Sequence, residues 1–268
     1  MNPAGLILAL LIFADAAQAA ELTLSIGAAS RTWSTVELLA HPRTQQIVIA
    51  DDVSYKRNMH YQAVPLAALL TDVQPGDHLQ VLAMDGFAAE LPAAPLLKSS
   101  AAQAWLAVED PARPWPALSA GKASAGPFYL VWQNPQAARI GPEQWPFKIA
   151  SIRRLAPVAE RFPALLPASA AEPAVQAGFA QYQKHCMACH RLNTAGDSQL
   201  GPDLNLPHNP TEYFASDFLV AYIRDPQSLR RWPQGKMPGF NQAVLSDEEL
   251  SQLLAYLRHM AGRKRNAQ

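Results

Sequence analysis

Hydrophobic and polar positions follow two different patterns along the chain. Before about residue 155, apolar residues form short runs bounded by glycine, proline or asparagine, a pattern typical of β-strands. The runs that we expect to be strands are 21–26, 46–50, 79–83, 128–132 and 147–152. The better helix candidates in this part are 34–39 and 65–70. Residues 21–155 are therefore predicted to form one β-rich α+β domain.

After residue 173, apolar residues recur at helical spacing. The clearest helix begins at Ser246, which forms a capping box with Glu249, and it carries one apolar stripe. The stripe consists of Leu250, Leu253, Leu254 and Leu257. A helix is also expected over 174–185, and a shorter one over 217–225 ends before Pro226. We predict that residues 174–268 form an all-α domain.

Two of these helices are predicted to pack against each other. Phe179 and Tyr182 lie three residues apart, on one face of the helix over 174–185. The leucine stripe of the last helix needs an apolar partner, and this face can supply it. Because Gly178 has no side chain, it would let the two helix backbones approach closely.

The segment between the two patterns is rich in proline. Pro157, Pro163, Pro167 and Pro173 are interleaved with alanines, and no apolar periodicity persists. Such a composition is typical of a semi-rigid linker. We expect residues 156–173 to connect the two domains.

The first residues of the chain have the pattern of a secretion signal. An unbroken apolar run over 6–14 is followed by small residues that offer an A-x-A cleavage site ending at Ala19. Nine apolar residues are too few to span a bilayer. The first five residues contain no Lys or Arg, so an uncleaved anchor or a buried N-terminal helix remains an alternative. We expect 1–19 to be a signal peptide, the mature chain to be periplasmic, and no stable membrane span to remain in it.

Composition and charge exclude several classes of protein. The 22 basic and 22 acidic side chains give a formal net charge of zero, which provides no broad positive field for nucleic acid. With 49% hydrophobic and 16% charged residues, the chain is also unlike a disordered protein. We expect no nucleic-acid partner.

Both cysteines of the chain lie in one motif, Cys186-Met187-Ala188-Cys189-His190. Two residues three apart in a helical turn project their thiols to the same side, where they can form thioether bonds with the two vinyl groups of haem. The imidazole of the next residue can then reach the iron from that side. The motif predicts one covalently bound haem c, anchored by Cys186 and Cys189 with His190 as an axial ligand.

Three other interpretations of the cysteine pair remain open. A thioredoxin-like redox pair would need a βαβ context, which the predicted helices do not provide. A zinc site would need four ligands and would have to recruit distant histidines such as His208. A structural disulfide within the motif is disfavoured by the tight spacing.

A second axial ligand is expected from the loop Lys236-Met237-Pro238-Gly239-Phe240. Its proline and glycine fix an irregular backbone that can present the thioether of Met237. Ligation by His and Met raises the reduction potential and closes the iron to outside ligands, which suits electron transfer. His208 is the chief alternative ligand, whereas His259 is expected at a helix end facing water.

Residues 174–262 resemble a small class I cytochrome c. The resemblance rests on the C-x-x-C-H motif, the Gly201-Pro202-Asp203-Leu204 turn, the stretch 222–226, the Met237 loop and the last helix. It implies that the backbone carbonyl of Pro202 accepts a hydrogen bond from the axial histidine. A haem histidine needs such an acceptor to hold the orientation of its ring.

Residues 21–155 resemble, more faintly, the molybdopterin-binding domain of the sulfite-oxidase type. The matching segments are 64–70, 81–87 and 126–132. Catalytic members bind molybdenum through a cysteine thiolate, and residues 21–155 contain no cysteine. We therefore expect a docking or scaffold module rather than a molybdenum enzyme. Met59 and His60 are a further candidate for a small metal or anion site.

Together these features predict an exported monohaem c-type cytochrome. It would pass single electrons from a periplasmic dehydrogenase to an oxidase or another cytochrome, and it would have no substrate chemistry of its own. One alternative is a haem-containing oxidoreductase, similar to a sulfite dehydrogenase, whose N-terminal domain binds a cofactor. The other is a haem-based sensor from which Met237 dissociates.

Overall fold

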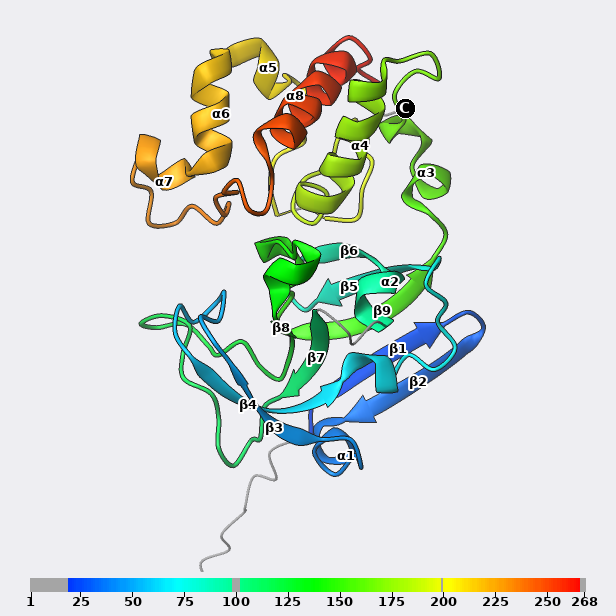
Figure 1. Ribbon diagram of the computed structural model, residues 1–268, viewed down its shortest axis with the longest axis vertical. Helices are drawn as coiled ribbons and strands as arrows, with labels where there is room; N and C mark the ends of the chain where they lie inside the picture. The colour runs from blue at the N-terminus through cyan, green and yellow to red at the C-terminus, as the bar shows by residue number, and fades with distance from the viewer. Residues whose placement is uncertain (1–18, 98–101, 199, 266–268) are drawn as a thin grey trace, which may run out of the picture.

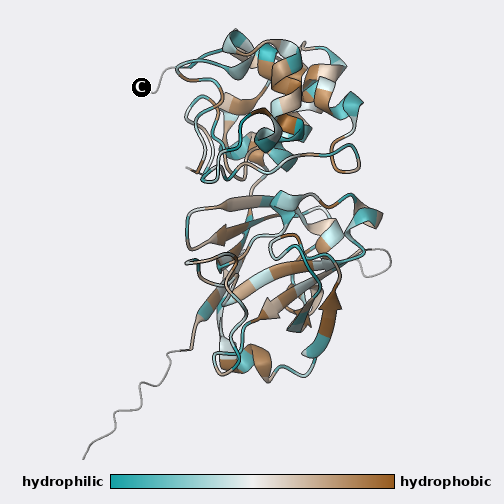
Figure 2. Ribbon diagram, turned by 90° about the vertical axis from the view of Figure 1, so that its left-hand side faces the viewer, coloured by the Kyte–Doolittle hydropathy of each residue, from teal (hydrophilic) through white to brown (hydrophobic). Residues whose placement is uncertain are grey.

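The computed structural model describes residues 19–97, 102–198 and 200–265, and it contains a β-rich part and a helical part (Figure 1). Most of the expected signal peptide therefore lies outside the described residues. The strands of the β-rich part are hydrophobic over much of their length (Figure 2). Each part has its own core, because buried apolar residues form one cluster over 22–152 and a second over 158–260.

The first sheet of the β-rich part has five strands in the order β2-β1-β9-β5-β6. These strands are β1 (Glu21–Ile26), β2 (Ala29–Ser34), β5 (His78–Ala83), β6 (Ala88–Pro92) and β9 (Ile149–Leu155). Neighbours are antiparallel except β1 and β9, which pair in parallel with Leu24 opposite Ile152. Both of these side chains are buried, so the pairing register is set by the apolar face.

The second sheet has four antiparallel strands in the order β3-β4-β7-β8. They are β3 (Gln45–Ile49), β4 (Met59–Pro65), β7 (Gln103–Val108) and β8 (Phe128–Gln133). Short helices and 3-10 turns connect the strands: α1 (Thr35–Leu39), η1 (Leu66–Ala68), α2 (Ala93–Leu97), η2 (Pro135–Ala138) and η3 (Pro142–Gln144). The central residues of β7 and β8 are buried on both faces, which explains their continuous apolar runs.

Five of the nine strands in the described residues are confirmed, whereas β2, β4, β6 and β7 lie outside the predicted runs. All five expected strands are present as β1, β3, β5, β8 and β9, and the expected helix over 34–39 is α1. The helix expected over 65–70 is wrong, because Pro65 ends β4 and only a 3-10 turn follows. Strand β2 is mostly exposed at a sheet edge and β6 contains Glu90, so neither shows an apolar pattern.

The proline-rich segment differs from the expected linker. It contains α3 (Val158–Arg161) and the 3-10 turn η4 (Pro163–Leu165). The side chains of Val158 and Leu165 are buried in the core of the helical part. Tyr256 also donates a hydrogen bond to the carbonyl of Leu165 at 2.7 Å. The prolines shape turns that lie against the helical part, so this segment is packed structure.

In the described residues, the helical part contains five helices and long irregular loops. The helices are α4 (Pro173–His185), α5 (Pro210–Tyr213), α6 (Ser216–Arg224), α7 (Pro226–Leu229) and α8 (Asp247–Ala261). The prediction of an all-α domain is wrong. The described residues of 186–209 and 230–246 contain no helix, and an antiparallel bridge joins Leu192 to Ala195. These loops are rich in Gly, Pro and Asn, whose backbone preferences favour turns over helix.

Helices α4 and α8 form the centre of the helical part, where they lie side by side (Figure 1). As expected, the Phe179 and Tyr182 face meets the leucine helix, and both rings contact Tyr256 at centroid distances of 5.6 and 5.5 Å. A Cβ atom on Gly178 would overlap the carbonyl oxygen of Gln252. None of the helices in the described ranges is both long and apolar enough to cross a membrane.

Replacing Gly178 by Ala tests this packing. The added methyl group would force α4 and α8 apart, and we expect a loss of about 1–3 kcal/mol of unfolding free energy. Gly76→Ala is the control, because a Cβ there would meet no atom within 4 Å. Denaturant unfolding followed by circular dichroism would measure both variants. Equal stability of Gly178→Ala and wild type would contradict the proposed close approach.

Candidate functional site

The C-x-x-C-H motif forms a tight turn at the end of α4. Cys186 is the C-cap of that helix, and its carbonyl accepts hydrogen bonds from the backbone N–H groups of Cys189 and His190 at 3.1 and 2.9 Å. Met187 and Ala188 are buried and anchor the turn, whereas both cysteines are half-buried and free. The turn therefore presents two free thiols followed directly by an imidazole.

The ring of His190 is held on two sides. Its Nδ1 lies 2.8 Å from the backbone oxygen of Pro202, so Nδ1 carries the proton and donates it to that carbonyl. A Cβ on Gly201 would lie 2.5 Å from Cε1 and 2.6 Å from Nδ1 of this ring, so only glycine leaves room for it. Burial lowers the pKa of His190, which favours the neutral imidazole. Nε2 is thereby left as the nitrogen that can bind a metal.

The two thiols are in an environment that keeps them protonated. Burial, with a further contribution from the carboxylate of Glu143, raises the pKa of Cys186 well above its usual range. The same two causes, in the same order, raise the pKa of Cys189 to about 11. A redox-active pair or a zinc site needs cysteines whose thiolate form is stabilised. The described residues also contain no group of three or more His, Cys, Asp or Glu placed to hold a metal ion.

The Met237 loop is anchored to the end of α6. A Cβ on Gly239 would lie 2.5 Å from the carbonyl oxygen of Arg224, so the two backbones touch. The N–H of Phe240 donates to the carbonyl of Ile223 at 3.1 Å, and the guanidinium of Arg224 donates to the carbonyl of Phe240 at 2.8 Å. Met237 itself is half-buried against the core of the helical part.

The alternative ligands occupy other environments. Met187 and Met260 are each 1% exposed within the core. His208 is exposed on the loop before α5. His259 was expected to face water. Instead, its Nε2 accepts a hydrogen bond from the N–H of Ala168 at 3.0 Å.

Sequence reasoning missed a buried set of three asparagines, Asn193, Asn205 and Asn209. The amide of Asn205 donates to Asn193 and to the carbonyl of Met260, both at 2.8 Å. The amide of Asn209 donates to Asn205 at 2.9 Å and to the carbonyl of Leu257 at 3.0 Å. The loop that carries Pro202 is thus fixed to the last turns of α8. The only sequence feature that could have predicted this set is the high frequency of Asn in an irregular segment.

The candidate metal or anion site in the β-rich part is not formed. Met59 and His60 are neighbours on β4, so their side chains point to opposite faces of the sheet. Met59 is buried and His60 is exposed.

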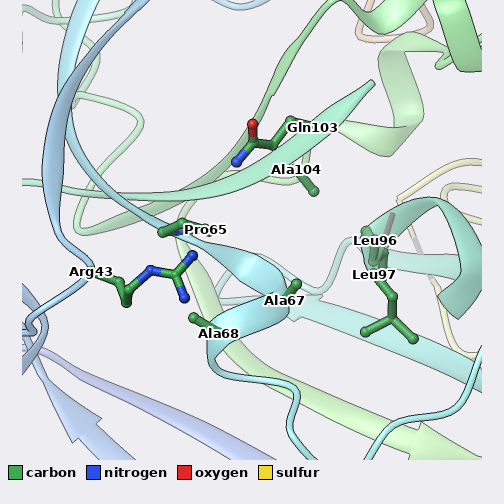
Figure 3. Close-up of a pocket in the computed structure, with 8 residues that line it drawn as sticks. All are labelled: Arg43, Pro65, Ala67, Ala68, Leu96, Leu97, Gln103 and Ala104. Atoms are coloured by element: carbon green, nitrogen blue, oxygen red, sulfur yellow. The ribbon is translucent and has the colours of Figure 1, made fainter. Parts of the chain in front are cut away.

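Two small cavities lie in the β-rich part, and neither identifies a ligand. The larger, of about 190 Å³, is lined mainly by small apolar residues, with Arg43 and Gln103 as its polar members (Figure 3). The second, of about 130 Å³, includes His60 and Trp115. Pockets that bury small-molecule ligands are usually about 300–1,000 Å³.

Comparison with known families gives a match for part of the chain. Residues 175–261, about a third of the chain, match the cytochrome c family. No curated protein matches the chain. Residues 175–261 are therefore similar to c-type cytochromes, a family whose members carry covalently bound haem c and transfer electrons. The resemblance of residues 21–155 to a molybdopterin-binding domain receives no support from these comparisons.

The donor set in the structure is compatible with haem c. Two free thiols lie on one turn of chain, and the ring of His190 has its Nδ1 engaged and its Nε2 available. The space against the imidazole exists because residue 201 has no Cβ. Covalent attachment of haem does not require thiolates with a lowered pKa in the free protein, so the protonated thiols are no obstacle.

Asn205→Ala tests the asparagine set. The change removes one buried hydrogen bond each from the carbonyl of Met260 and from the side chains of Asn193 and Asn209, so we expect a loss of about 1–3 kcal/mol of unfolding free energy. Asn58→Ala is the control, because the exposed Asn58 only accepts a hydrogen bond from the N–H of Asp51. Denaturant unfolding measures both variants. A loss for Asn205→Ala no greater than for the control would contradict the role of the buried amides.

Proposed function

We propose that this protein is an exported electron carrier with one covalently bound haem c. Cys186 and Cys189 anchor the ring, and His190 and Met237 are its axial ligands. The observation that carries the proposal is the imidazole of His190, fixed by Pro202 and Gly201 directly after two free thiols. When bound, the haem supplies a one-electron ferric and ferrous couple.

Different residues of the chain hold the haem and adjust its properties. Pro202 holds the ring of His190 in one orientation and keeps its proton on Nδ1. Met237 would close the sixth position to outside ligands, and its loop is held by the contacts of Arg224 and Gly239. Such a closed site favours outer-sphere electron transfer over oxygen or peroxide chemistry.

The redox partners proposed are a periplasmic dehydrogenase as donor and an oxidase or another cytochrome as acceptor. The β-rich domain serves as the docking or scaffold module. Its lack of cysteine argues against a molybdenum centre of the thiolate type. The zero net charge means that docking depends on a local patch rather than on long-range attraction.

Export to the periplasm is part of the proposal. It is supported by the apolar run before the A-x-A site at Ala19, and by the match to c-type cytochromes, which are typically exported.

Spectroscopy of Met237→Ala tests the proposal. We expect pyridine haemochrome spectra of the c type in both wild type and variant, because the thioether bonds are untouched. The long-wavelength sulfur-to-iron band of the ferric protein should be present in wild type and absent in the variant. The ferrous variant should also bind CO, because its sixth position is open.

Met260→Leu is the matched control, since its thioether is buried in the core and should leave the band unchanged. A sulfur-to-iron band that persists in Met237→Ala would contradict the assigned ligand. Ready CO binding by wild type would indicate a sensor, and stoichiometric molybdenum in the purified protein would indicate an enzyme.

A further inference from the structure

The β-rich domain contacts the haem-binding motif before, within and after its five residues. Glu143 on η3 contacts His185, the residue before Cys186. The N–H of Ala88 on the edge strand β6 donates to the carbonyl of Ala188 at 3.4 Å. Gln80 on β5 donates to Asp197, seven residues after His190, at 2.5 Å. Figure 1 shows β5 and β6 on the side of the β-rich part that faces the helices.

The pair of Glu143 and His185 is the most deeply buried of these contacts. Oε1 of Glu143 and Nδ1 of His185 are 2.8 Å apart, and their side chains are only 4% and 1% exposed. Among the described residues, Oε2 of Glu143 and Nε2 of His185 have no hydrogen-bond partner. A doubly protonated ring would leave the buried Nε2–H without an acceptor, so the geometry favours a ring that donates from Nδ1 to the carboxylate.

His185 connects this carboxylate to both halves of the haem site. It directly precedes the first thioether cysteine, at the end of α4. The edge of its ring also contacts Phe240, with a centroid distance of 5.5 Å, and Phe240 lies three residues after Met237. The influence of Glu143 on the pKa values of both Cys186 and Cys189 agrees with a position close to the two thiols that would anchor the haem.

No neighbouring Lys or Arg side chain neutralises the charge of the Glu143 carboxylate by direct contact in the described residues. Lys184 on α4 donates to the backbone carbonyl of Arg139 at 3.2 Å, and burial lowers its pKa. Arg139 pairs with Glu249 on α8. A buried charge acts over a longer range than an exposed one, because little water screens it.

We propose that Glu143 is a positioning residue of the haem site that acts through His185. Its ionised carboxylate fixes the end of α4 from which Cys186 follows. Its negative charge also stabilises the ferric state and lowers the reduction potential. Reduction adds one electron to the iron and leaves the hydrogen bond between Glu143 and His185 in place. The inference rests on the proposed function, because a potential exists only when haem is bound.

Potentiometric titration of the full-length holoprotein tests this role. In Glu143→Gln the amide oxygen still accepts from His185, but the charge is gone. We expect the ratio of ferrous to ferric protein at a fixed ambient potential to rise threefold to tenfold, where tenfold corresponds to 59 mV for a one-electron couple. The sulfur-to-iron band should be retained.

Asp197→Asn is the matched control, because Asp197 is also a carboxylate in contact with the β-rich domain but its side chain is 36% exposed. We expect a change below twofold, because water screens this charge. An unchanged or lower potential in Glu143→Gln, or an equal rise in Asp197→Asn, would overturn the proposal.

The double variant Glu143→Gln with His185→Gln covers the case in which the single variant does not fold. Two amides can keep the hydrogen bond without any charge, and we expect the same rise in the ratio of ferrous to ferric protein. A double variant with the potential of wild type would overturn the proposal. If wild type itself carries no covalent haem, the proposed function fails, whereas attached haem with an unchanged potential defeats only this inference.

Discussion

The hydrogen bond from Nδ1 of His190 to the carbonyl of Pro202 is the interaction around which the helical part is organised. It fixes the orientation of the ring and determines which nitrogen remains for a metal. The absence of a side chain at Gly201 makes room for the same ring. The buried asparagines hold the loop that supplies this acceptor against α8. Helix α8 is in turn packed on α4, the helix from which the cysteine turn emerges.

The β-rich domain is in direct contact with the helical part. Arg161 of the proline-rich segment pairs with Glu90 of β6 and with Asp197 of the loop after the motif, both at 2.8 Å. The segment that looks like a linker in sequence therefore joins the two parts. For an electron carrier, such contacts allow one domain to tune a redox centre held in the other, while its remaining surface stays available to partners.

The sequence alone predicts the features that depend on local chemistry. The C-x-x-C-H spacing defines the cysteine turn, and the capping box at Ser246 defines the start of α8. The small residue at 178 predicts the close contact of α4 and α8. Apolar runs locate five of the strands, but not β4 and β7, although both are largely buried.

Features that depend on distant partners could not be predicted in this way. Strands β2 and β6 lie at sheet edges, and β6 carries Glu90, which is buried only because Arg161 and His78 reach it from elsewhere. The asparagine set and the pair of Glu143 and His185 join residues that are far apart in the chain. The all-α prediction extended helical periodicity into loops whose backbone is held by side chains such as Asp203, which accepts from the N–H groups of Asn193 and Thr194.

Mass spectrometry of the peptide that contains residues 186–190 tests the central claim most directly. The protein should be matured in a host that is competent for cytochrome assembly. The account predicts that this peptide carries the mass of one haem and that neither thiol can be alkylated. Two free thiols, or a disulfide between Cys186 and Cys189, would contradict it.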